Sequence, residues 1–330
     1  MNNDKNSTSF NKHTIEDLKK LQSYNLEQKI QITKARIIEW YSKNNGKVYV
    51  SFSGGKDSTV LLNIVRQLYP DVPAVFIDTG LEYPELREFV KTIPNVIWLK
   101  PKMNFKKVIE IYGYPIVSKE VSKVIHDAKT AIAKGNSNSY AIRQLEGKYI
   151  NPHTGKISPY NKSKWKFLLD APFPISNRCC DVMKKQTVHQ YEKESGNKPI
   201  IGTMASESRQ RRSQWIINGC NAFNAKNPSS KPLSFWTEQD VLKYIKINNL
   251  NYAPIYGDIV LDENGKYSTT GANRTGCVFC AYGVQCEKEP NRFQKLKETH
   301  PKLWNYCMRP SSEGGLNMRE VLDYIGVKVE

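Results

Sequence analysis

The stretch Val48–Ser58, VYVSFSGGKDS, decides the fold of this chain. Its first five residues are mostly apolar and predict a β-strand, the paired glycines break that strand, and the apolar run after Ser58 predicts a helix. A strand that turns through glycines into a helix gathers backbone N–H groups at the positive helix N-terminus, which predicts an anion-binding loop. The spacing is not G-x-x-x-x-G-K, so this is not a Walker P-loop, and an ordinary strand-to-helix turn is the alternative.

Strand and helix patterns alternate along the chain on both sides of this loop. Further strands are predicted at residues 72–78, 95–99 and 198–202, and helices at 26–42, 59–69, 84–92 and 237–247. This alternation predicts an α/β fold with a doubly wound, mainly parallel sheet. Ligands of such sheets bind where the strands end, and the glycine loop and Asp78 both follow predicted strands, so we expect them at one site.

The composition is that of a globular protein. With 330 residues, 39% of them hydrophobic, and a mean hydropathy of −0.58, the chain can bury a large core. No run approaches the roughly 18 apolar residues that suggest a membrane helix, and the polar start of the chain lacks the apolar segment of a signal peptide. We therefore expect a cytoplasmic protein with no membrane partner, whose seven cysteines are thiols or metal ligands.

The net charge of +17 is large and suits a polyanionic partner such as nucleic acid. Solubilising surface lysines would give the same charge without such a partner. Residues 126–169 have a weaker pattern, and lysines alternate with aromatic residues in 148–153 and 162–167. That composition fits a surface on which single-stranded bases stack, or a solvated insertion whose rings pack back onto the sheet.

Four of the seven cysteines form two close pairs, the adjacent Cys179 and Cys180 and the C-x2-C pair Cys277 and Cys280. A C-x2-C turn brings two thiolates onto one metal, so we expect a metal site. Spacing alone leaves zinc and an iron–sulfur cluster open. Adjacent cysteines are difficult to fit around one tetrahedral zinc, whereas the larger face of a cubane accommodates both. Cys220 has no partner nearby in the sequence and is predicted to be a core thiol.

A set of short motifs resembles one enzyme family. The loop S-G-G-K-D-S resembles the PP-loop of the ATP pyrophosphatase superfamily, which holds the pyrophosphate of ATP while the α-phosphate is attacked. The other motifs follow in family order: IDTG and EYP within 77–84, RCC at 178–180, Gly202 through Arg211, WT-x-x-DV at 236–241 and TGC-x-x-C at 275–280. Together they resemble the phosphoadenosine phosphosulfate (PAPS) reductase family over roughly Leu26 to Cys307.

The resemblance implies roles for particular residues. ATP, with Mg²⁺, would bind along Ser51, Ser53, Gly54, Gly55, Lys56, Asp57, Ser58 and Thr59, with Asp78 and Thr79 on the adenosine side and Arg178, Gly202 and Arg211 near anionic oxygens. Of these, Lys56 and Asp57 would be catalytic. The cysteines Cys179, Cys180, Cys277 and Cys280 resemble the [4Fe-4S] ligands of bacterial adenylylsulfate (APS) reductases, with zinc as the less favoured metal.

Two departures separate the chain from the sulfonucleotide reductases. Their PP-loop lacks the lysine, whereas Lys56 is intact here, as in members that cleave ATP. They also carry a C-terminal Glu-Cys-Gly-Leu-His segment, whereas no cysteine follows Cys307 here. The chain is thus more similar to the sulfurtransferase of DNA phosphorothioation systems and, distantly, to tRNA thiolases. A third departure is Met204, where the family commonly has an arginine, and it leaves one phosphate or sulfate contact open.

These features predict an ATP-dependent, adenylating and pyrophosphate-releasing [4Fe-4S] sulfurtransferase that acts on nucleic acid, either DNA or tRNA. A sulfur donor such as a cysteine desulfurase is the expected partner, and the sequence indicates no oligomeric state. Two alternatives stay open. One is a thiol-dependent APS or PAPS reductase, and the other is a non-enzymatic, metal-stabilised nucleic-acid-binding protein.

Three segments are predicted: a disordered tail at 1–12, a PP-loop domain at 13–260 with an insertion at about 126–169, and a mostly helical, cysteine-rich region at 261–330. Cys307 precedes Arg309, and a neighbouring cation lowers a thiol pKa. We therefore expect Cys307 near the metal, as a catalytic persulfide carrier or as an exchangeable fourth ligand in place of Cys179, and expect Cys286 to be dispensable. The alternative is that both thiols are buried and inert.

Overall fold

The computed structural model describes residues 12–330 and divides the chain into two compact units. The sheet unit comprises the chain up to Asp78 together with Glu82–Lys100 and Val188–Thr275. The helical unit comprises Thr79–Leu81, Pro101–Thr187 and Gly276–Glu330. The tail predicted at 1–12 lies, except for its last residue, outside the described residues.

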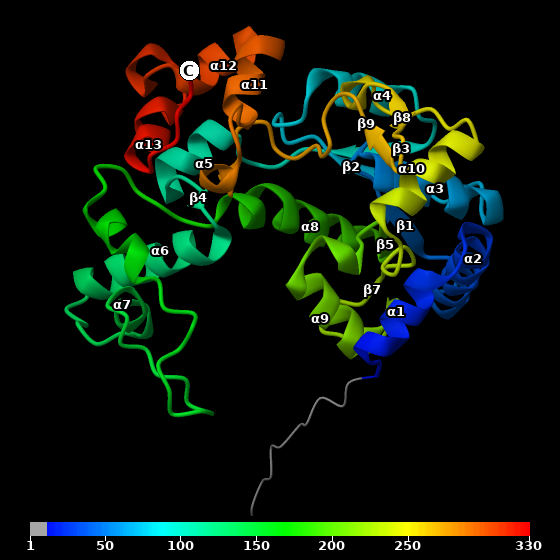
Figure 1. Cartoon of the computed structure of the whole chain (residues 1–330), viewed down its shortest axis with the longest axis horizontal. Coiled ribbons are helices and arrows are strands. Elements are labelled where there is room, and N and C mark those ends of the chain that lie inside the picture. The colour runs from blue at the N-terminus through cyan, green and yellow to red at the C-terminus, as the bar shows by residue number, and fades with distance from the viewer. Residues whose placement is uncertain (1–11) are drawn as a thin grey trace, which may run out of the picture. The chain divides into compact units, whose positions relative to one another are not determined.

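The sheet unit contains a six-stranded sheet in the order β3-β2-β1-β5-β7-β6 (Figure 1). Its strands are β1 (Val48–Ser51), β2 (Ala74–Ile77), β3 (Val96–Leu99), β5 (Lys198–Ile201), β6 (Asn221–Ala222) and β7 (Ser229–Ser230). Neighbouring strands pair in parallel except β6 and β7, and the register places Val50 opposite both Ala74 and Ile200. The prediction of an α/β fold with a mainly parallel sheet is confirmed.

The helices of this unit are α1 (Ile15–Ser23), α2 (Leu26–Lys43), α3 (Lys56–Leu68), α4 (Pro84–Lys91), α8 (Gln186–Ser195, which starts at the unit boundary), η3 (Ala205–Glu207), α9 (Arg209–Asn218), α10 (Glu238–Ile247) and η4 (Pro254–Tyr256), with a hairpin of β8 (Ile259–Leu261) and β9 (Tyr267–Thr269). Four of these helices, α1, α2, α9 and α10, begin at a Thr, Asn or Ser side chain that caps their first turn. A capping box starts α1, because the side chains of Thr14 and Asp17 each accept a hydrogen bond from the backbone N–H of the other residue.

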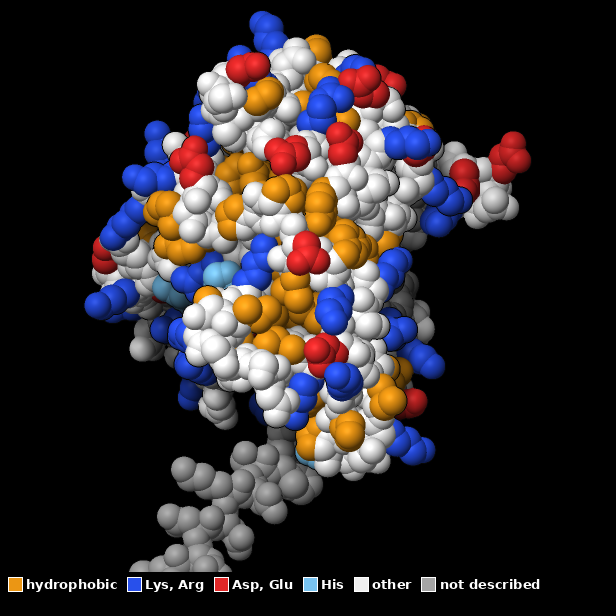
Figure 2. Space-filling view, turned by 90° about the vertical axis from the view of Figure 1, so that its left-hand side faces the viewer, with side chains coloured by type: hydrophobic (Ala, Val, Ile, Leu, Met, Phe, Trp, Pro, Cys, Tyr) orange, Lys and Arg blue, Asp and Glu red, His pale blue; other side chains and the backbone are white. Residues whose placement is uncertain are grey.

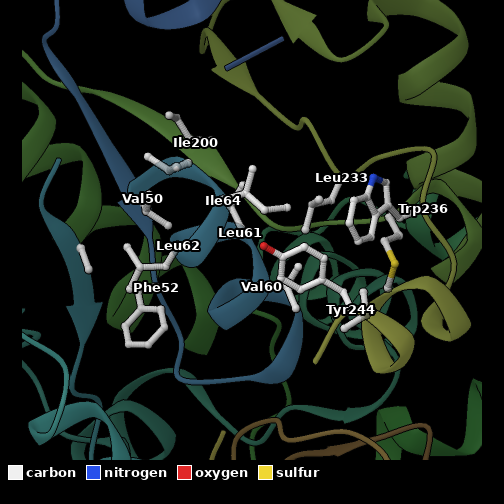
Figure 3. Packing of buried hydrophobic residues seen from close by; sticks show 14 of the residues in the cluster. Val50, Phe52, Val60, Leu61, Leu62, Ile64, Ile200, Leu233, Trp236 and Tyr244 are labelled. Atoms are coloured by element: carbon white, nitrogen blue, oxygen red, sulfur yellow. The ribbon is translucent and has the colours of Figure 1, made fainter. Parts of the chain in front are cut away.

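The core of the sheet unit lies between β1, β5, α3 and α10 (Figure 3). Val50 and Ile200 of the sheet, and Ile64 of α3, are completely buried. Trp236, which precedes α10, is also buried, and its Nε1 donates to Thr33 Oγ1 at 2.9 Å. This packing fixes the ends of β1 and β5, where the glycine loop lies.

The helical unit is built from α5 (Phe105–Tyr112), α6 (Lys119–Ala133), α7 (Tyr140–Leu145), η1 (Ser163–Asp170), η2 (Asp181–Lys185), η5 (Val284–Cys286), α11 (Arg292–Thr299), α12 (Pro301–Met308), η6 (Ser311–Glu313) and α13 (Met318–Tyr324), with β4 (Ile116–Val117) and β10 (Ala281–Tyr282). The first part of the predicted insertion is not irregular, because α6 continues to Ala133 with a buried apolar face. No helix within residues 12–330 is both long and apolar enough to cross a membrane.

The boundary between the units differs from the one predicted at residue 260. Pro101–Thr187 belongs with the C-terminal residues, because β4 pairs in parallel with β10 and places Ile116 opposite Ala281. The hydroxyl of Tyr114 also donates to the backbone carbonyl of Leu316 at 2.9 Å. A strand of two residues has no periodic pattern, so this pairing is not visible in the sequence.

Candidate nucleotide and thiol sites

The glycine loop joins β1 to α3 and is held by serine side chains. Ser58 Oγ donates to the carbonyl of Gly55 at 2.9 Å and accepts from the backbone N–H of Ser53 at 3.2 Å. Gly54 has a φ of +73°, and a Cβ atom there would lie 2.7 Å from Val90 Cγ2. Gly55 is the N-cap of α3 and supplies no side-chain acceptor for the first-turn amides, an arrangement that suits a bound anion.

A cavity of about 690 Å³ lies at this loop, within the sheet unit. Eight of the residues predicted to bind nucleotide line it: Ser51, Ser53, Gly55, Lys56, Asp57, Ser58, Gly202 and Arg211. They come from the ends of β1 and β5, the start of α3, and α9, so the structure brings them together at the carboxyl edge of the sheet. The volume is within the range of small-molecule sites in proteins.

Lys56 is buried in this cavity and already has two oxygen partners. Its Nζ lies 2.5 Å from Glu238 Oε1 and 2.5 Å from the backbone carbonyl oxygen of Asn273, and 5.4 Å from the centre of the Tyr256 ring. Because the side chain of Glu238 is 53% exposed, it can turn toward solvent when a phosphate takes its place beside Lys56.

Two guanidinium groups share one carboxylate in the same cavity. Arg211 and Arg274 both donate to Glu207, which also accepts from the backbone N–H of Met204 at 2.8 Å. Burial and the charge of Arg274 lower the pKa of Arg211. Met204, at the position that the resemblance associates with an arginine, lines the same cavity as Arg211 and Arg274.

Asp57 carries a buried carboxylate oxygen without a partner. Its Oδ1 makes no hydrogen bond, and burial raises the pKa of Asp57 against the opposing charges of Lys56 and Arg274. An unpaired buried oxygen is costly unless a ligand satisfies it. A carboxylate oxygen beside a phosphate cradle has the chemistry of a Mg²⁺ ligand, so the donor type fits this ion.

The other residues predicted to bind nucleotide are Gly54, Thr59, Asp78, Thr79 and Arg178. Gly54 and Thr59 shape the loop rather than line the cavity, and Thr59 Oγ1 donates to a loop carbonyl at 3.1 Å. Asp78 is buried and accepts from Arg87 at 2.7 Å. Thr79 and Arg178 belong to the helical unit, where Arg178 lies over the Tyr112 ring, so their roles stay predictions.

The part of the cavity lining that follows α9 in the sequence lies mostly between or outside the motif positions, with Thr237 and Thr275 as the exceptions. It is formed by Thr237–Gln239, Tyr256, Lys266 and Asn273–Thr275. The WT-x-x-DV motif lies beside this part of the cavity, but its Asp240 caps α10 together with Thr237. Glu238, which lines the cavity, occupies one of the two unspecified positions of the motif. Tyr256 and Asn273–Thr275 lie in connections after α10 that have no regular spacing, so only the three-dimensional structure places them here.

The four cysteines predicted as metal ligands line one small cavity within the helical unit. Cys179 and Cys180 immediately precede η2, with their Sγ atoms 3.9 Å apart. Cys277 and Cys280 form a turn before β10, closed by a hydrogen bond of 3.0 Å from the N–H of Cys280 to the carbonyl of Cys277. The rest of the lining is mainly apolar: Leu81, Phe105, Pro115, Met183 and Phe279, with Lys184.

Basic side chains surround these thiols. The hydrogen bond from Cys179 lowers the pKa of Cys180, and Lys119 and Lys184 act in the same direction against burial. The same hydrogen bond, together with burial, raises the pKa of Cys179. Arg292 donates to a backbone carbonyl of the C-x2-C turn at 3.0 Å. These cations reduce the cost of gathering several thiolates in one apolar place.

The donor set fits a [4Fe-4S] cluster, because such clusters are held by four cysteine thiolates and tuned by an apolar surrounding. Within residues 12–330, no three His, Cys, Asp or Glu side chains are placed to hold a single metal ion. Zinc needs its thiolates at about 2.3 Å from one point, whereas a cubane distributes them over four irons. The choice between the cluster and zinc stays a prediction.

The three remaining cysteines occupy different environments. Cys307 is fully buried in α12 and burial raises its thiol pKa, so the lowering predicted from the nearby Arg309 is wrong. It is not among the residues that line the thiol cavity, and its environment does not support a nucleophilic role. Cys286 is exposed, so it is not the buried thiol of the alternative prediction. Cys220 is a buried core thiol, as predicted, and accepts from Ser234 Oγ at 3.4 Å.

Comparison with curated proteins finds distant relatives. An uncharacterised protein of Methanocaldococcus jannaschii is 24% identical over 320 residues, which cover 94% of this chain and 57% of that protein. A second protein of that organism is 26% identical over 265 residues, which cover 80% of this chain and 41% of that protein. The chain therefore spans about half the length of these relatives. The adenosine 5'-phosphosulfate reductase of Lysinibacillus sphaericus is 22% identical over 222 residues, covering 67% of this chain and 72% of that enzyme.

Among solved structures, the U34-tRNA thiolase of Methanococcus maripaludis with its [4Fe-4S] cluster matches with a TM-score of 0.34 and 16% identity, covering 68% of this chain and 66% of that one. A likeness at this score says nothing about activity. The model of the phosphoadenosine phosphosulfate reductase domain matches residues 47–145 and 120–281, which run from the start of the glycine-loop strand through the C-x2-C turn. With most of its length matched, the chain belongs to the phosphoadenosine phosphosulfate reductase family.

Proposed function

We propose that this protein is an ATP-dependent, pyrophosphate-releasing sulfurtransferase that adenylates a nucleic-acid acceptor, either DNA or tRNA. The observation that carries the proposal is Lys56, an intact PP-loop lysine buried in a cavity that also contains Arg211 and Arg274. The resemblance described above associates this lysine with members that cleave ATP, and its absence with members that bind a sulfonucleotide.

The charged groups of the cavity suit a triphosphate. The loop amides and Lys56 would bind the β- and γ-phosphates, and the guanidinium groups of Arg211 and Arg274 would each hold two anionic oxygens. All three cations are paired with carboxylates in the protein without nucleotide. Phosphate oxygens would take the place of the half-exposed Glu238 beside Lys56, so this buried cation keeps an anionic partner on binding. Asp57 would hold Mg²⁺, which neutralises phosphate charge when bound.

The reaction has two displacements. The acceptor oxygen attacks the α-phosphorus of ATP, the bond to the bridging oxygen breaks, and pyrophosphate leaves with the bonding electrons. Hydrosulfide then attacks the activated atom, and AMP leaves with the oxygen. A sulfur donor such as a cysteine desulfurase would supply this sulfur as a persulfide. A thiol would then attack the inner sulfur of the persulfide, so that hydrosulfide leaves and the two remaining sulfurs form a disulfide. Cys179, Cys180, Cys277 and Cys280 would hold a [4Fe-4S] cluster, which would supply iron to bind the hydrosulfide.

The second candidate is thiol-dependent reduction of APS or PAPS, which the APS reductases among the curated relatives favour. The two reactions differ in their products. In the proposed reaction, ATP yields AMP and pyrophosphate only when an acceptor is present. In the reductase reaction, the sulfonucleotide yields sulfite and a nucleotide without any ATP.

Anaerobically purified protein should be incubated with sulfide and ATP and a panel of tRNA and DNA, and separately with APS or PAPS and a dithiol. We expect pyrophosphate and AMP in equal amounts with one of the nucleic acids. Sulfite release from a sulfonucleotide, with no ATP cleavage, would establish the reductase instead. If neither reaction occurs, the non-enzymatic binding protein becomes the better explanation.

A further inference from the structure

A segment of the helical unit that follows α7 and includes the first five residues of η1 forms a basic hairpin, which we define as residues 148–167. Its two arms meet in an antiparallel bridge between Ile150 and Ile157. The backbone N–H of Asn151 donates to the carbonyl of Lys156 at 2.9 Å, and that of Ser158 donates to Tyr149 at 2.8 Å. The hairpin therefore has a defined conformation despite its irregular sequence pattern.

Polar side chains, rather than an apolar core, fix the base of the basic hairpin. The side chain of Asn161 accepts from the N–H of Tyr149 at 3.2 Å and donates to the carbonyls of Gly147 and Tyr149 at 3.1 and 3.2 Å. Gln144 of α7 is buried, and its Nε2 donates to the carbonyl of Tyr160 at 3.3 Å. Because these hydrogen bonds hold the hairpin, its conformation does not depend on burying its large apolar side chains.

Those apolar side chains lie in solvent. Ile157 is 71% exposed, Tyr160 is 62% exposed and Ile150 is 55% exposed. Single exposed hydrophobic residues are common, but three within a short ordered hairpin are typical of an interaction surface. On the face drawn in Figure 2, hydrophobic side chains lie in the open among Lys, Arg, Asp and Glu side chains. The chemistry of the partner then depends on the charge around these groups.

The charge of the basic hairpin is of one sign, since residues 148–167 contain five lysines and no aspartate or glutamate. Two of these lysines are paired with carboxylates outside the hairpin, Lys148 with Glu146 and Lys162 with Glu120. Among the described residues, no carboxylate pairs with the other three, Lys156, Lys164 and Lys166, all of which are exposed. The hairpin thus offers uncompensated positive charge to a polyanion.

The cations and the rings of the hairpin are interleaved at short range. Lys162 Nζ lies 5.8 Å from the centre of the Tyr160 ring, and Lys164 Nζ lies 5.2 Å from the centre of the Trp165 ring. A nucleotide presents a flat base and a phosphate a few ångströms apart, so a ring beside an ammonium group can stack the base while the lysine pairs the phosphate. In a duplex the base faces are covered by their neighbours, and the rings would find no partner.

We propose that the basic hairpin binds single-stranded nucleic acid, or an unpaired segment of a folded one, with little sequence preference. This assignment rests on the proposed nucleic-acid acceptor and names the surface that holds it. The lysines contribute through phosphate contacts, and Tyr160 contributes a stacked base. The same unit carries the four clustered cysteines, so the hairpin belongs to the part of the chain that holds the candidate sulfur chemistry.

The test is fluorescence anisotropy of labelled 20-nucleotide single strands and a matched duplex, without ATP, at several salt concentrations. The test variant replaces the unpaired lysines, K156Q/K164Q/K166Q. Its matched control removes the same charge from exposed lysines of the sheet unit, K43Q/K243Q/K246Q. We expect the test variant to lose at least tenfold in single-strand affinity and about 2 from the slope of log K against log salt, since each contact contributes about 0.7. The control should bind as the wild type does.

The second variant is Tyr160→Ala, which should weaken single-strand binding roughly 5- to 100-fold and leave the salt slope unchanged. Equal losses in the lysine variant and its control would overturn the proposal, as would duplex binding that matches single-strand binding. Competition by polyglutamate as strong as by a single strand would also overturn it, because it would indicate an acidic protein partner. Binding is measured without ATP, so a failure of the proposed sulfurtransferase reaction would leave these outcomes unchanged and be seen separately.

Discussion

Replacing Gly54 with alanine tests the geometry of the glycine loop. The residue has a φ of +73°, a left-handed conformation that costs a residue with a side chain about 1–2 kcal/mol. The new Cβ would also lie 2.7 Å from Val90 Cγ2 and 2.8 Å from Leu86 Cδ2, two buried side chains of α4. Inserting a methyl group into a packed core costs about a further 1–3 kcal/mol. Gly54→Ala should therefore lower the free energy of unfolding by about 2–5 kcal/mol.

The chain offers a matched control for this substitution. Gly196, in the same unit, also has a φ of +73°, but no atom lies within 4 Å of a Cβ built there. Gly196→Ala should therefore lower the free energy of unfolding only by the conformational cost of about 1–2 kcal/mol. Urea unfolding of both variants, with ΔG from the midpoint and the m-value, measures the difference. Equal losses in the two variants would refute the close packing of the loop against α4.

Three further predictions concern the two sites. Lys56→Ala should reduce acceptor-dependent pyrophosphate release roughly 100-fold or more under conditions in which circular dichroism shows the variant folded, and unchanged release would contradict a role for this lysine in ATP cleavage. Anaerobically purified protein should contain about four irons per chain, as a cubane requires. Cys277→Ser should lose this iron, whereas Cys286→Ser should keep it. Stoichiometric zinc without sulfide would show that the predicted metal is wrong. Burial raises the pKa of Asp57 above its usual value near 3.8, so the folded protein without ligand holds this proton more tightly than the unfolded chain. The free energy of unfolding should therefore fall as pH rises from about 4 through the raised pKa. Asp57→Asn should flatten that part of the curve of unfolding free energy against pH. A curve like that of the wild type in this variant would contradict the burial of Asp57.

The features that the sequence predicts well are those fixed by neighbours along the chain. The turn at Gly54, the helix that starts after it and the hydrogen bond from Ser58 to the loop all depend on residues within a few positions of one another. The parallel sheet follows from the alternation of strand and helix patterns. The clustering of the cysteines was implied by resemblance to a family rather than by spacing, and the structure places all four around one cavity.

Features set by tertiary contacts are not predictable in the same way. Arg274 meets Glu207 across 66 intervening residues, and nothing local marks either as a partner of the other. The error at Cys307 has a local cause. Cys307 lies in the last turn of α12 and is completely buried, whereas Arg309 follows the helix in an extended conformation. Closeness in the sequence therefore says little about whether the charge of Arg309 reaches this thiol.

The interleaving of the two units has a consequence for how the protein is made. The chain passes between them after Asp78, Leu81, Lys100, Thr187 and Thr275. During synthesis from the N-terminus, the last strand and helix of the sheet unit emerge before any of Gly276–Glu330, so that unit can close first. β4 cannot pair until β10 has been synthesised. Cys179 and Cys180 likewise cannot complete a four-thiol site until Cys277 and Cys280 have been synthesised. A chain released at Thr275 would therefore contain every residue that lines the glycine-loop cavity but only half of the thiols that a cluster needs.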